Sequence, residues 1–403
     1  MIFSYGLFVC LTLLFLISME NKSLPRELLE MFKFNPSSAT VSALCQQREK
    51  ILPEAFAFLF QYFNESFESH KTFHGYKLLA CDGSDLNIAR NPDDKDTHFP
   101  SADGGKGFNQ LHLNAFYDLC DRRYTDALIQ PGRKKNECRA MADMIDRCDS
   151  SAKTIFIADR AYEAYNLFAH AGQRNMYYLI RAKDIDSNGI LSGLTLPQSD
   201  EFDVQIRIIL TRKQTKQVKA NPMLYKIMPN NSIFDYLDLD ENPFYPMNFR
   251  VVRFALPTGD YECVITNLPE DEFPPDELKT LYNMRWGIET SFRELKYTIG
   301  LNCFHAKKVE YVIQEIWARL LLYNFCEIIT TYVLIQKKTT KHVQQVNYTA
   351  AVLICRHFLW FDDISPPNVE ILIRKNLLPV RPNRHDPRKV MSKSFVSFIY
   401  RIA

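Results

Sequence analysis

The stretch from Tyr282 to Lys296 combines side chains that can do phosphate and metal chemistry. It reads YNMRWGIETSFRELK and holds Tyr282, Arg285, Glu289 and Lys296. On a helix that advances about 100° per residue, these four side chains fall within about 60° of one another. A carboxylate can bind a metal ion, whereas Arg and Lys can bind phosphates. The alternative interpretation is a solvated helix face with an ordinary ion pair between Arg285 and Glu289.

Two further carboxylates are predicted at the ends of buried strands. Asp82 ends the apolar run KLLACD before a Gly-Ser turn, and Asp159 ends the run TIFIAD. Open α/β sheets bind ligands at the carboxyl ends of their strands, although each aspartate alone is also typical of a turn or a cap. Together with Glu289 they make three carboxylates, which would repel one another without a cation. Mg²⁺ is the expected cation where a phosphate is also bound, and two such ions can promote phosphoryl transfer.

The elements that must position these acids follow an α/β pattern. From about residue 72 the sequence predicts three strands, a helix, a strand and a helix. We expect Asn136 to cap the first of these helices, and Pro274 and Pro275 to open the helix that carries Glu289. Residues 185–268 contain strand-like runs and a PTGD turn, which indicates a β-rich insertion. The cations of this insertion form either a solvated face or a face towards DNA: Arg207, Arg212, Lys213, Lys216, Lys219, Arg250 and Arg253.

Length and composition indicate a globular protein of two or three structural units. The chain has 403 residues and a formal net charge of +2, which neither requires nor excludes a nucleic-acid partner. Positive charge gathers near the end, where eight Lys or Arg and one acid lie between Arg374 and Arg401. The ten cysteines show no C-x-x-C motif, so we expect reduced core cysteines in a cytoplasmic protein.

The N-terminal region is expected to be helical, with Arg48 and Lys50 exposed. Residues 1–19 are almost entirely apolar, but no Lys or Arg precedes them as in a signal peptide. A buried helix, or a chain start inside a longer reading frame, is therefore preferred over a membrane segment. The predicted regions are a helical N-terminal region with a truncated DNA-binding part (1–71), the first half of a core (72–184), the β-rich insertion (185–268), the second half of the core (269–345), and a C-terminal helix with a basic tail (346–403).

Three motifs together resemble a known family. They are DGS around Asp82, ADRAY around Asp159, and Tyr-x2-Arg-x3-Glu-x6-Lys from Tyr282 to Lys296. This combination resembles the DDE transposases of the bacterial insertion-sequence four family, and the likeness covers roughly residues 20–403. It implies an α/β fold with a ribonuclease H-like core, a β-rich insertion between the second Asp and the catalytic Glu, and helical N- and C-terminal regions.

The resemblance also assigns roles to particular residues. It implies that Asp82, Asp159 and Glu289 are the catalytic triad and the metal ligands, binding Mg²⁺ with Mn²⁺ as a substitute. It further implies contacts to DNA phosphates by the following side chains: Tyr282, Arg285, Lys296, Arg160 and Tyr162. Any ion pair between Arg285 and Glu289 is then expected to be loose, or broken once DNA and metal bind.

The implied function is transposition, in which water first cleaves the DNA at the ends of an insertion sequence and the freed 3′-OH then attacks. The implied partners are double-stranded DNA, as terminal inverted repeats and target DNA, and a second copy of the chain in the DNA complex. The implied location is the bacterial cytoplasm, in association with the nucleoid. Two alternatives stay open: a non-catalytic DNA-binding remnant, suggested by the short region before the core, and a membrane-anchored protein, suggested only by residues 1–19.

Overall fold

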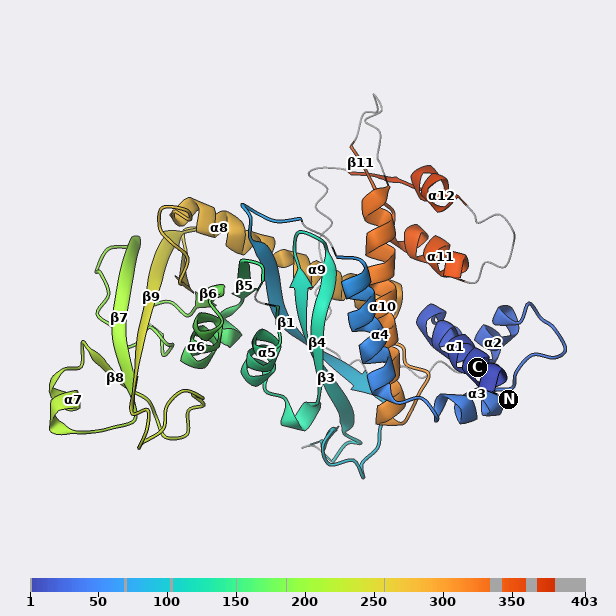
Figure 1. Cartoon of the computed structure of the whole chain (residues 1–403), viewed down its shortest axis with the longest axis horizontal. Helices are drawn as coiled ribbons and strands as arrows, with labels where there is room; N and C mark the ends of the chain where they lie inside the picture. The colour runs from blue at the N-terminus through green and yellow to red at the C-terminus, as the bar shows by residue number, and fades with distance from the viewer. Residues whose placement is uncertain are drawn as a thin grey trace.

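The computed structural model describes residues 2–68, 71–101, 104–149, 151–185, 187–256, 258–333, 343–359 and 368–380, with side chains from residue 10 onwards. Ten strands of this described chain form one mixed sheet that runs through much of the molecule (Figure 1). The order across the sheet is β2 (His98–Phe99), β3 (Phe108–Asp118), β1 (Lys77–Ile88), β5 (Thr154–Ala158), β6 (Tyr177–Ala182), β10 (Tyr261–Thr266), β9 (Phe244–Ala255), β7 (Phe202–Thr211) and β8 (Tyr225–Ile227), with β4 (Arg123–Pro131) paired to β3.

The first half of the sheet has the predicted order of three strands, helix, strand and helix. β1, β3 and β4 pair antiparallel, whereas β1, β5 and β6 pair parallel. The connections to β5 and β6 contain α5 (Glu137–Asp146) and α6 (Tyr165–Gln173). The side chain of Asn136 accepts a hydrogen bond from the Arg139 amide at 2.9 Å, so its predicted capping role is confirmed.

β1 does not end at Asp82, and the prediction of a Gly-Ser turn at this point is wrong. The strand continues to Ile88 because β3 pairs with it antiparallel along the whole second half. The parallel pairing with β5 ends earlier, where Ala80 lies opposite Ile157. Asp82 therefore lies inside a long strand, but just beyond the point at which the parallel part of the sheet ends.

The β-rich segment continues the same sheet, since β10 pairs antiparallel with β6 and with β9. It contains only one short helix in its described residues, α7 (Lys216–Ala220). Two of its arginines lie neither on a solvated face nor on a face free to meet DNA. Arg250 is fully buried with its Nε 2.6 Å from Asp203 Oδ1, and Arg253 Nε lies 2.9 Å from Asp184 Oδ1. Acids distant in sequence, which the local pattern did not reveal, neutralise both cations.

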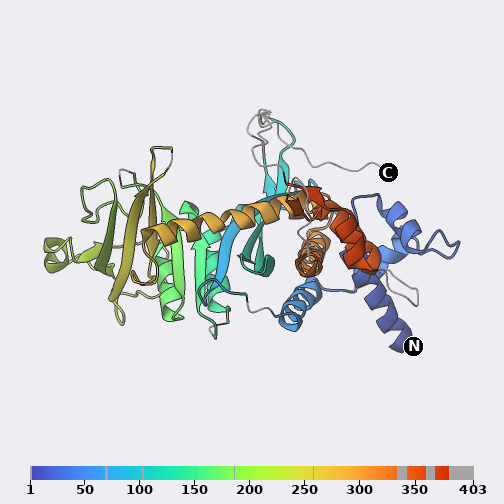
Figure 2. The ribbon, with the colours of Figure 1, turned by 90° about the horizontal axis from the view of Figure 1, so that it is seen from above.

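The helix that carries Glu289 is divided into three parts. α8 (Pro275–Met284) begins at the predicted proline, α9 (Trp286–Glu294) follows, and a π-helical turn, η3 (Leu295–Ile299), completes the run. Arg285 separates α8 from α9 but keeps right-handed helical angles (φ −52°, ψ −30°). The two helices therefore run almost in line along one face of the sheet (Figure 2). α5 and α6 cover the opposite face, where they pack in a separate cluster with Leu79 and Cys81 of β1.

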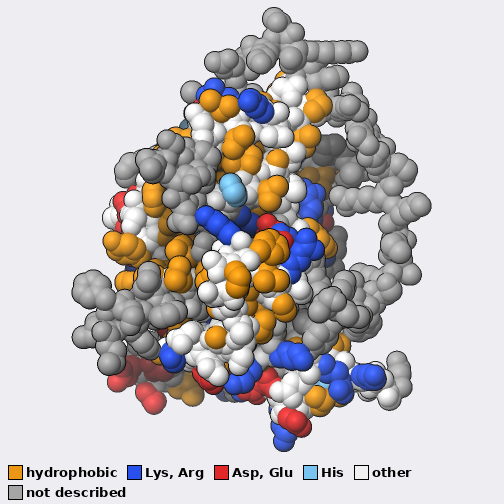
Figure 3. All heavy atoms as spheres, turned by 90° about the vertical axis from the view of Figure 1, so that its right-hand side faces the viewer, with side chains coloured by type: hydrophobic (Ala, Val, Ile, Leu, Met, Phe, Trp, Pro, Cys, Tyr) orange, Lys and Arg blue, Asp and Glu red, His pale blue; other side chains and the backbone are white. Residues whose placement is uncertain are grey.

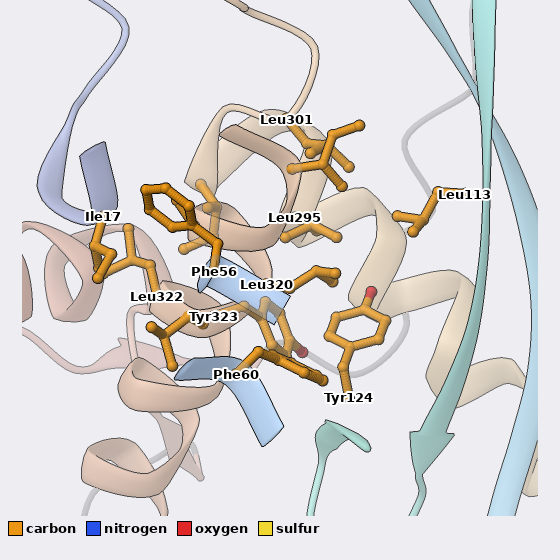
Figure 4. Packing of buried hydrophobic residues seen from close by; sticks show 14 of the residues in the cluster. Ile17, Phe56, Phe60, Leu113, Tyr124, Leu295, Leu301, Leu320, Leu322 and Tyr323 are labelled. Atoms are coloured by element: carbon orange, nitrogen blue, oxygen red, sulfur yellow. The ribbon is translucent and has the colours of Figure 1, made fainter. Parts of the chain in front are cut away.

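The largest core cluster lies between the sheet and the long helix α10 (Val309–Tyr332). α4 (Pro53–Ser66) packs along α10 and contributes Phe56 and Phe60, both fully buried. Leu320 and Tyr323 of α10 meet these rings, as Figure 4 shows. Leu295 of η3 belongs to the same cluster, so the end of the Glu289 helix is anchored in this core.

The N-terminal helices α1 (Ile2–Ser18), α2 (Leu24–Met31) and α3 (Val41–Arg48) lie beside α10. Phe15 and Leu16, near the end of α1, are buried in the main core cluster. No helix of the described residues combines the length and the apolarity that crossing a membrane requires.

Arg48 is buried, which corrects the prediction that it is exposed. Its Nη1 lies 2.9 Å from Glu315 Oε1, and its Nε donates to Gln314 Oε1 at 2.7 Å. Both partners belong to α10, and the local pattern around Arg48 contains no sign of them. Lys50 is exposed, as predicted.

The C-terminal part packs beside the N-terminal helices. It contains β11 (Gln344–Gln345), α11 (Tyr348–Leu359), α12 (Val369–Lys375) and β12 (Leu378–Pro379). This end of the molecule exposes apolar side chains between scattered Lys and Arg (Figure 3), among them Leu353 and Ile371. Most of the predicted basic tail lies outside the described residues. None of the ten cysteines, all of which lie in the described residues, forms a disulfide bond. The prediction of core cysteines holds only in part, because Cys10 and Cys45 are exposed and four are fully buried: Cys81, Cys263, Cys326 and Cys355.

Candidate catalytic site

The three predicted acids come from three elements that meet at one place on the sheet. Asp82 lies on β1, Asp159 directly follows β5, and Glu289 lies on α9, which packs against β1. Asp82 Oδ1 accepts a hydrogen bond from the Gly83 amide at 2.8 Å. Asp159 Oδ1 accepts one from the Ala161 amide at 2.8 Å and so caps η2 (Arg160–Tyr162).

The charges of these acids act on one another. Burial raises the pKa of the Asp82 carboxyl to about 6, against a hydrogen bond from Gly83 that lowers it. The negative charges of Asp159 and Glu289 raise this pKa further, and the positive charge of Arg285 lowers it. The carboxylates of Asp159 and Glu289 are therefore close enough to Asp82 to influence its pKa. The separate sequence patterns of the three acids could not establish this proximity.

Glu289 is held by Arg285 in a close ion pair. Arg285 Nη2 donates to Glu289 Oε1 at 2.6 Å, so the expectation of a loose pair is wrong for this arrangement of the chain. The Arg285 side chain is only 7% exposed, whereas that of Glu289 is 38% exposed. The guanidinium lies between the rings of Tyr282 and Trp286, 5.6 Å and 5.4 Å from their centroids. The two rings therefore enclose the cation, and the glutamate is the more exposed partner of the pair.

The candidate metal ligands, Asp82, Asp159 and Glu289, offer carboxylate oxygens, which are the ligands that hard divalent cations prefer. In the described part of the chain, however, no three Asp, Glu, His or Cys side chains are arranged to hold a metal ion. In this arrangement Glu289 is paired with Arg285, and Asp159 caps η2.

Two of the predicted phosphate-binding side chains lie beside the acids in open positions. Arg160 directly follows Asp159 and is exposed. Lys296 lies in η3, is half-buried, and its Nζ donates to the backbone oxygen of Asp85 at 3.4 Å. Burial lowers the pKa of Lys296, while the charges of Asp85 and Asp82 oppose this effect. These positions, with Arg285, bring three cations near the carboxylates.

The two predicted phosphate-binding tyrosines are buried. Tyr162 is 1% exposed and packs in the core cluster of α5 and α6, on the face of the sheet opposite α9. The prediction that Tyr162 contacts DNA phosphate is therefore corrected, because its hydroxyl does not reach the surface. Tyr282 is 3% exposed, packs beneath α8 beside Leu281, and touches Arg285 with its ring. Among the described residues neither hydroxyl has a hydrogen-bond partner of good geometry, although the Tyr162 hydroxyl interacts with the Cys81 thiol and that of Tyr282 with Arg285.

Sequence analysis missed a polar cluster directly behind Asp82. Here His112 of β3 lies between the carboxylates of Asp85 and Glu137. The available signal was weak, since it consisted of one histidine that interrupts the apolar run LHLNAF. Its two partners lie 27 residues before it and 25 residues after it, so only the folded sheet brings them together.

The mixed sheet and α9 thus bring Asp82, Asp159 and Glu289 close enough for their charges to interact. Residues 73–325 match the family model described as the transposase DDE domain. This match covers more than half of the chain, so the chain belongs to the DDE transposase family.

Several curated relatives are transposases of insertion sequences. The putative transposase InsL for insertion sequence element IS186A of Escherichia coli (strain K12) is 27% identical over 236 residues, which cover 55% of this chain and 61% of the relative. The transposase for IS421 of Escherichia coli matches equally well. The transposase InsG for IS4 of Escherichia coli (strain K12) is 30% identical over 136 residues, covering 30% of this chain and 29% of the relative. The predicted membership of the insertion-sequence four group is thereby confirmed.

The match spans about 61% of the length of the first of these relatives. Among solved structures, a piggyBac transposase synaptic complex with hairpin DNA matches at a TM-score of 0.41 and 10% identity. That match covers 95% of this chain and 77% of the other. A TM-score this low supports no inference about this chain.

Proposed function

We propose that this chain is a transposase that cleaves and joins DNA strands at the ends of an insertion sequence by phosphoryl transfer. One observation carries the proposal: the three acids of a DDE domain share one electrostatic field, and Arg285, Lys296 and Arg160 lie beside them. Phosphoryl transfer on DNA with metal ions needs two kinds of groups side by side: acids that bind the metal and cations that bind the DNA phosphates.

We infer a ribonuclease H-like core within the sheet, made from β4, β3, β1, β5 and β6 with α5, α6, α9 and α10. The strand order and the mixture of antiparallel and parallel pairs support this inference. The β-rich segment between Asp159 and Glu289 would be an insertion that extends the sheet. The proposed regions are 1–71, 72–184 for the first half of the core, 185–268 for the insertion, 269–345 for the second half of the core, and 346–403.

DDE transposases normally use divalent metal ions. Asp82, Asp159 and Glu289 would hold Mg²⁺, or Mn²⁺ in its place, as catalytic residues. When bound, the ions would activate the attacking oxygen and stabilise the leaving oxygen. The chain would supply the deprotonated carboxylate of Asp82. It would also supply the carboxylate of Glu289, after Glu289 has exchanged its ion pair with Arg285 for the metal. Because Asp82 is partly buried, water would screen the attraction between these carboxylates and the metal ions less than it does at an exposed site.

The phosphates of the cut strand would take the place of Glu289 on the Arg285 guanidinium. In the described part of the chain the buried Nε of Arg285 has no hydrogen-bond partner, and it would gain one from such a phosphate. Lys296 and the exposed Arg160 would bind neighbouring phosphates. The ring of Tyr282, 5.6 Å from the Arg285 guanidinium, would orient this cation. The partners would be double-stranded DNA, as terminal inverted repeats and target DNA, and a second copy of the chain in the DNA complex. The site of action would be the bacterial cytoplasm, at the nucleoid.

The test is Mg²⁺-dependent cleavage of a labelled DNA duplex that carries the terminal repeat of the element and its flank. D82A, D159A and E289A should each abolish cleavage but retain binding of the duplex in a gel-shift assay. The matched control is D96A, because Asp96 is an exposed acid that pairs only with Lys134 in the described structure. Cleavage that survives all three changes would refute the assignment. Tight binding by the wild type without cleavage would instead favour a non-catalytic DNA-binding remnant.

A further inference from the structure

A histidine lies between two carboxylates on the reverse face of the sheet from Glu289. His112 of β3 is 2% exposed, and its Nδ1 lies 2.6 Å from Asp85 Oδ1 of β1. Its Nε2 lies 3.0 Å from Glu137 Oε1, an ion pair without an aligned hydrogen bond. Glu137 is the first residue of α5, and Lys135 adds a second cation with its Nζ 3.1 Å from Asp85 Oδ1. We call His112, Asp85 and Glu137 the clasp.

The clasp touches the backbone next to Asp82. Asp85 is the residue of β1 that pairs with His112 in the sheet, and Gly83 lies between Asp85 and Asp82 on the strand. A Cβ at Gly83 would lie 2.5 Å from His112 Nε2 and 2.9 Å from Glu137 Oε1. No side chain fits at this position while the clasp is closed. The clasp therefore lies in close contact with the backbone of Gly83, the residue that directly follows Asp82.

The same end of α5 also reaches the second acid. Cys138, next to Glu137, donates from its Sγ to the backbone oxygen of Ala161 at 3.5 Å. The amide of Ala161 in turn donates to Asp159 at 2.8 Å. The start of α5 thus contacts the backbone around Asp82 through the clasp and the backbone around Asp159 through Cys138.

The charges of the clasp favour its closed form. Burial lowers the pKa of His112, but the hydrogen bond to Asp85 and the charges of Asp85 and Glu137 outweigh it, so the pKa is raised. The contact with His112 lowers the pKa of Asp85 to about 2 and also lowers that of Glu137. The raised pKa favours the protonated form of His112, in which a cation between two carboxylates connects β1, β3 and α5.

We propose that His112, Asp85 and Glu137 are positioning residues that fix the backbone next to Asp82 and Asp159, and thereby the orientation of these two carboxylates towards a metal ion. This proposal rests on the proposed function, because it assumes that these aspartates are metal ligands. Residues that orient metal ligands typically change metal affinity or activity about 10- to 100-fold when they are replaced. A purely structural role would lower stability without a specific loss of metal affinity.

The test compares H112A with a matched control, H170A, in Mn²⁺ binding by the DNA-free full chain in a calorimeter. His170 is also buried between two carboxylates, with its Nδ1 2.7 Å from Asp146 Oδ1 and its Nε2 2.9 Å from Asp235 Oδ2. Neither of these carboxylates lies on β1. H112A should bind Mn²⁺ about 10- to 100-fold more weakly than the wild type, whereas H170A should stay within about twofold even if its unfolding temperature falls. The Mn²⁺ concentration for half-maximal DNA cleavage should shift in parallel.

Two further variants cover the case in which H112A does not fold. E137Q removes one charge and keeps the shape of the side chain, and G83A forces the clasp open without removing any charge. Each should weaken Mn²⁺ binding, and G83A should add less to the effect in an H112A background, because the closer of the two side chains that its Cβ meets is gone while Glu137 remains. Mn²⁺ affinity within about twofold of the wild type in H112A, or in both E137Q and G83A, would overturn the proposal. If the wild type binds Mn²⁺ but cleaves no DNA, the proposed function fails, while the calorimetric comparison still decides the clasp.

Discussion

Replacing Arg48 by methionine should destabilise the fold by about 3–5 kcal/mol, because the change leaves a buried carboxylate without its cation. The side chains of Arg48 and Glu315 are 5% and 0% exposed, and Nη1 lies 2.9 Å from Oε1. Burial alone would raise the pKa of Glu315, but hydrogen bonding from His305 and the charge of Arg48 outweigh it and lower the pKa to about 2. Relative to the ordinary value of 4.5, this lowering corresponds to about 3 kcal/mol of stability, which Arg48 shares with His305 and Arg319.

The pH dependence gives the same pair a second test. Since the folded-state pKa of Glu315 lies below its unfolded value, its contribution to stability is present above about pH 4.5 and is lost as the pH falls towards 2. In R48M the carboxylate form of Glu315 is less favoured in the folded state. The folded-state pKa of Glu315 should therefore rise, and the loss of stability should begin at a higher pH. Urea unfolding followed by tryptophan fluorescence, at pH 7, 5 and 4, measures both effects.

A matched control and a double variant separate charge from packing. Lys308 and Glu49 form an exposed pair at 3.7 Å, so K308A should change the free energy of unfolding by less than about 1 kcal/mol. R48M/E315L should regain most of the stability lost in R48M, because it removes the unpaired charge. An R48M protein within about 1 kcal/mol of the wild type, or a double variant as unstable as R48M, would refute the reasoning.

Three further predictions concern strain, packing and the corrected tyrosine. Gly300→Ala should cost more than about 1 kcal/mol in urea unfolding, because its φ is +96° and a Cβ would lie 2.1 Å from a neighbouring side-chain oxygen. Gly259→Ala, with φ +89° and no atom within 4 Å, should show the smaller cost of backbone strain alone. Leu320→Ala should lose about 2–5 kcal/mol, because this side chain is fully buried, and a loss below about 1 kcal/mol would contradict its central place. Tyr162→Phe should leave DNA binding in a gel shift within about twofold of the wild type, whereas Arg160→Ala should weaken it; equal losses would restore Tyr162 as a contact.

Elements whose signals are local were predicted well. Asn136 caps α5, Pro275 starts α8, and Asp159 follows a buried strand directly. Each of these outcomes depends on a few adjacent residues, either through a side chain that satisfies free amides or through a proline ring that suits a first helical turn. The family motifs are local in the same sense, which is why residue types and short spacings suffice to indicate the three acids and the membership of the DDE transposases.

Outcomes that depend on distant partners were predicted poorly. Asp82 was expected at a strand end, but β3 extends the strand through it. Arg48 and Arg250 were expected to be solvated or to face DNA, but Glu315 and Asp203 pair with them inside the fold. Only contacts far apart in the sequence decide whether a cation is buried, because a charge leaves water only where an opposite charge or enough hydrogen bonds replace its hydration.

The sequence by itself determined the family and the order of elements in the first half of the sheet, and it pointed to three candidate acids, because local patterns encode these features. Only the tertiary structure decided how these residues relate to one another. It placed Glu289 on Arg285 at 2.6 Å, buried Tyr162 behind the sheet, and put His112 between two carboxylates next to the strand of Asp82. The physical reason is that the pairing of strands and the packing of α5 and α9 bring together side chains that no local pattern connects.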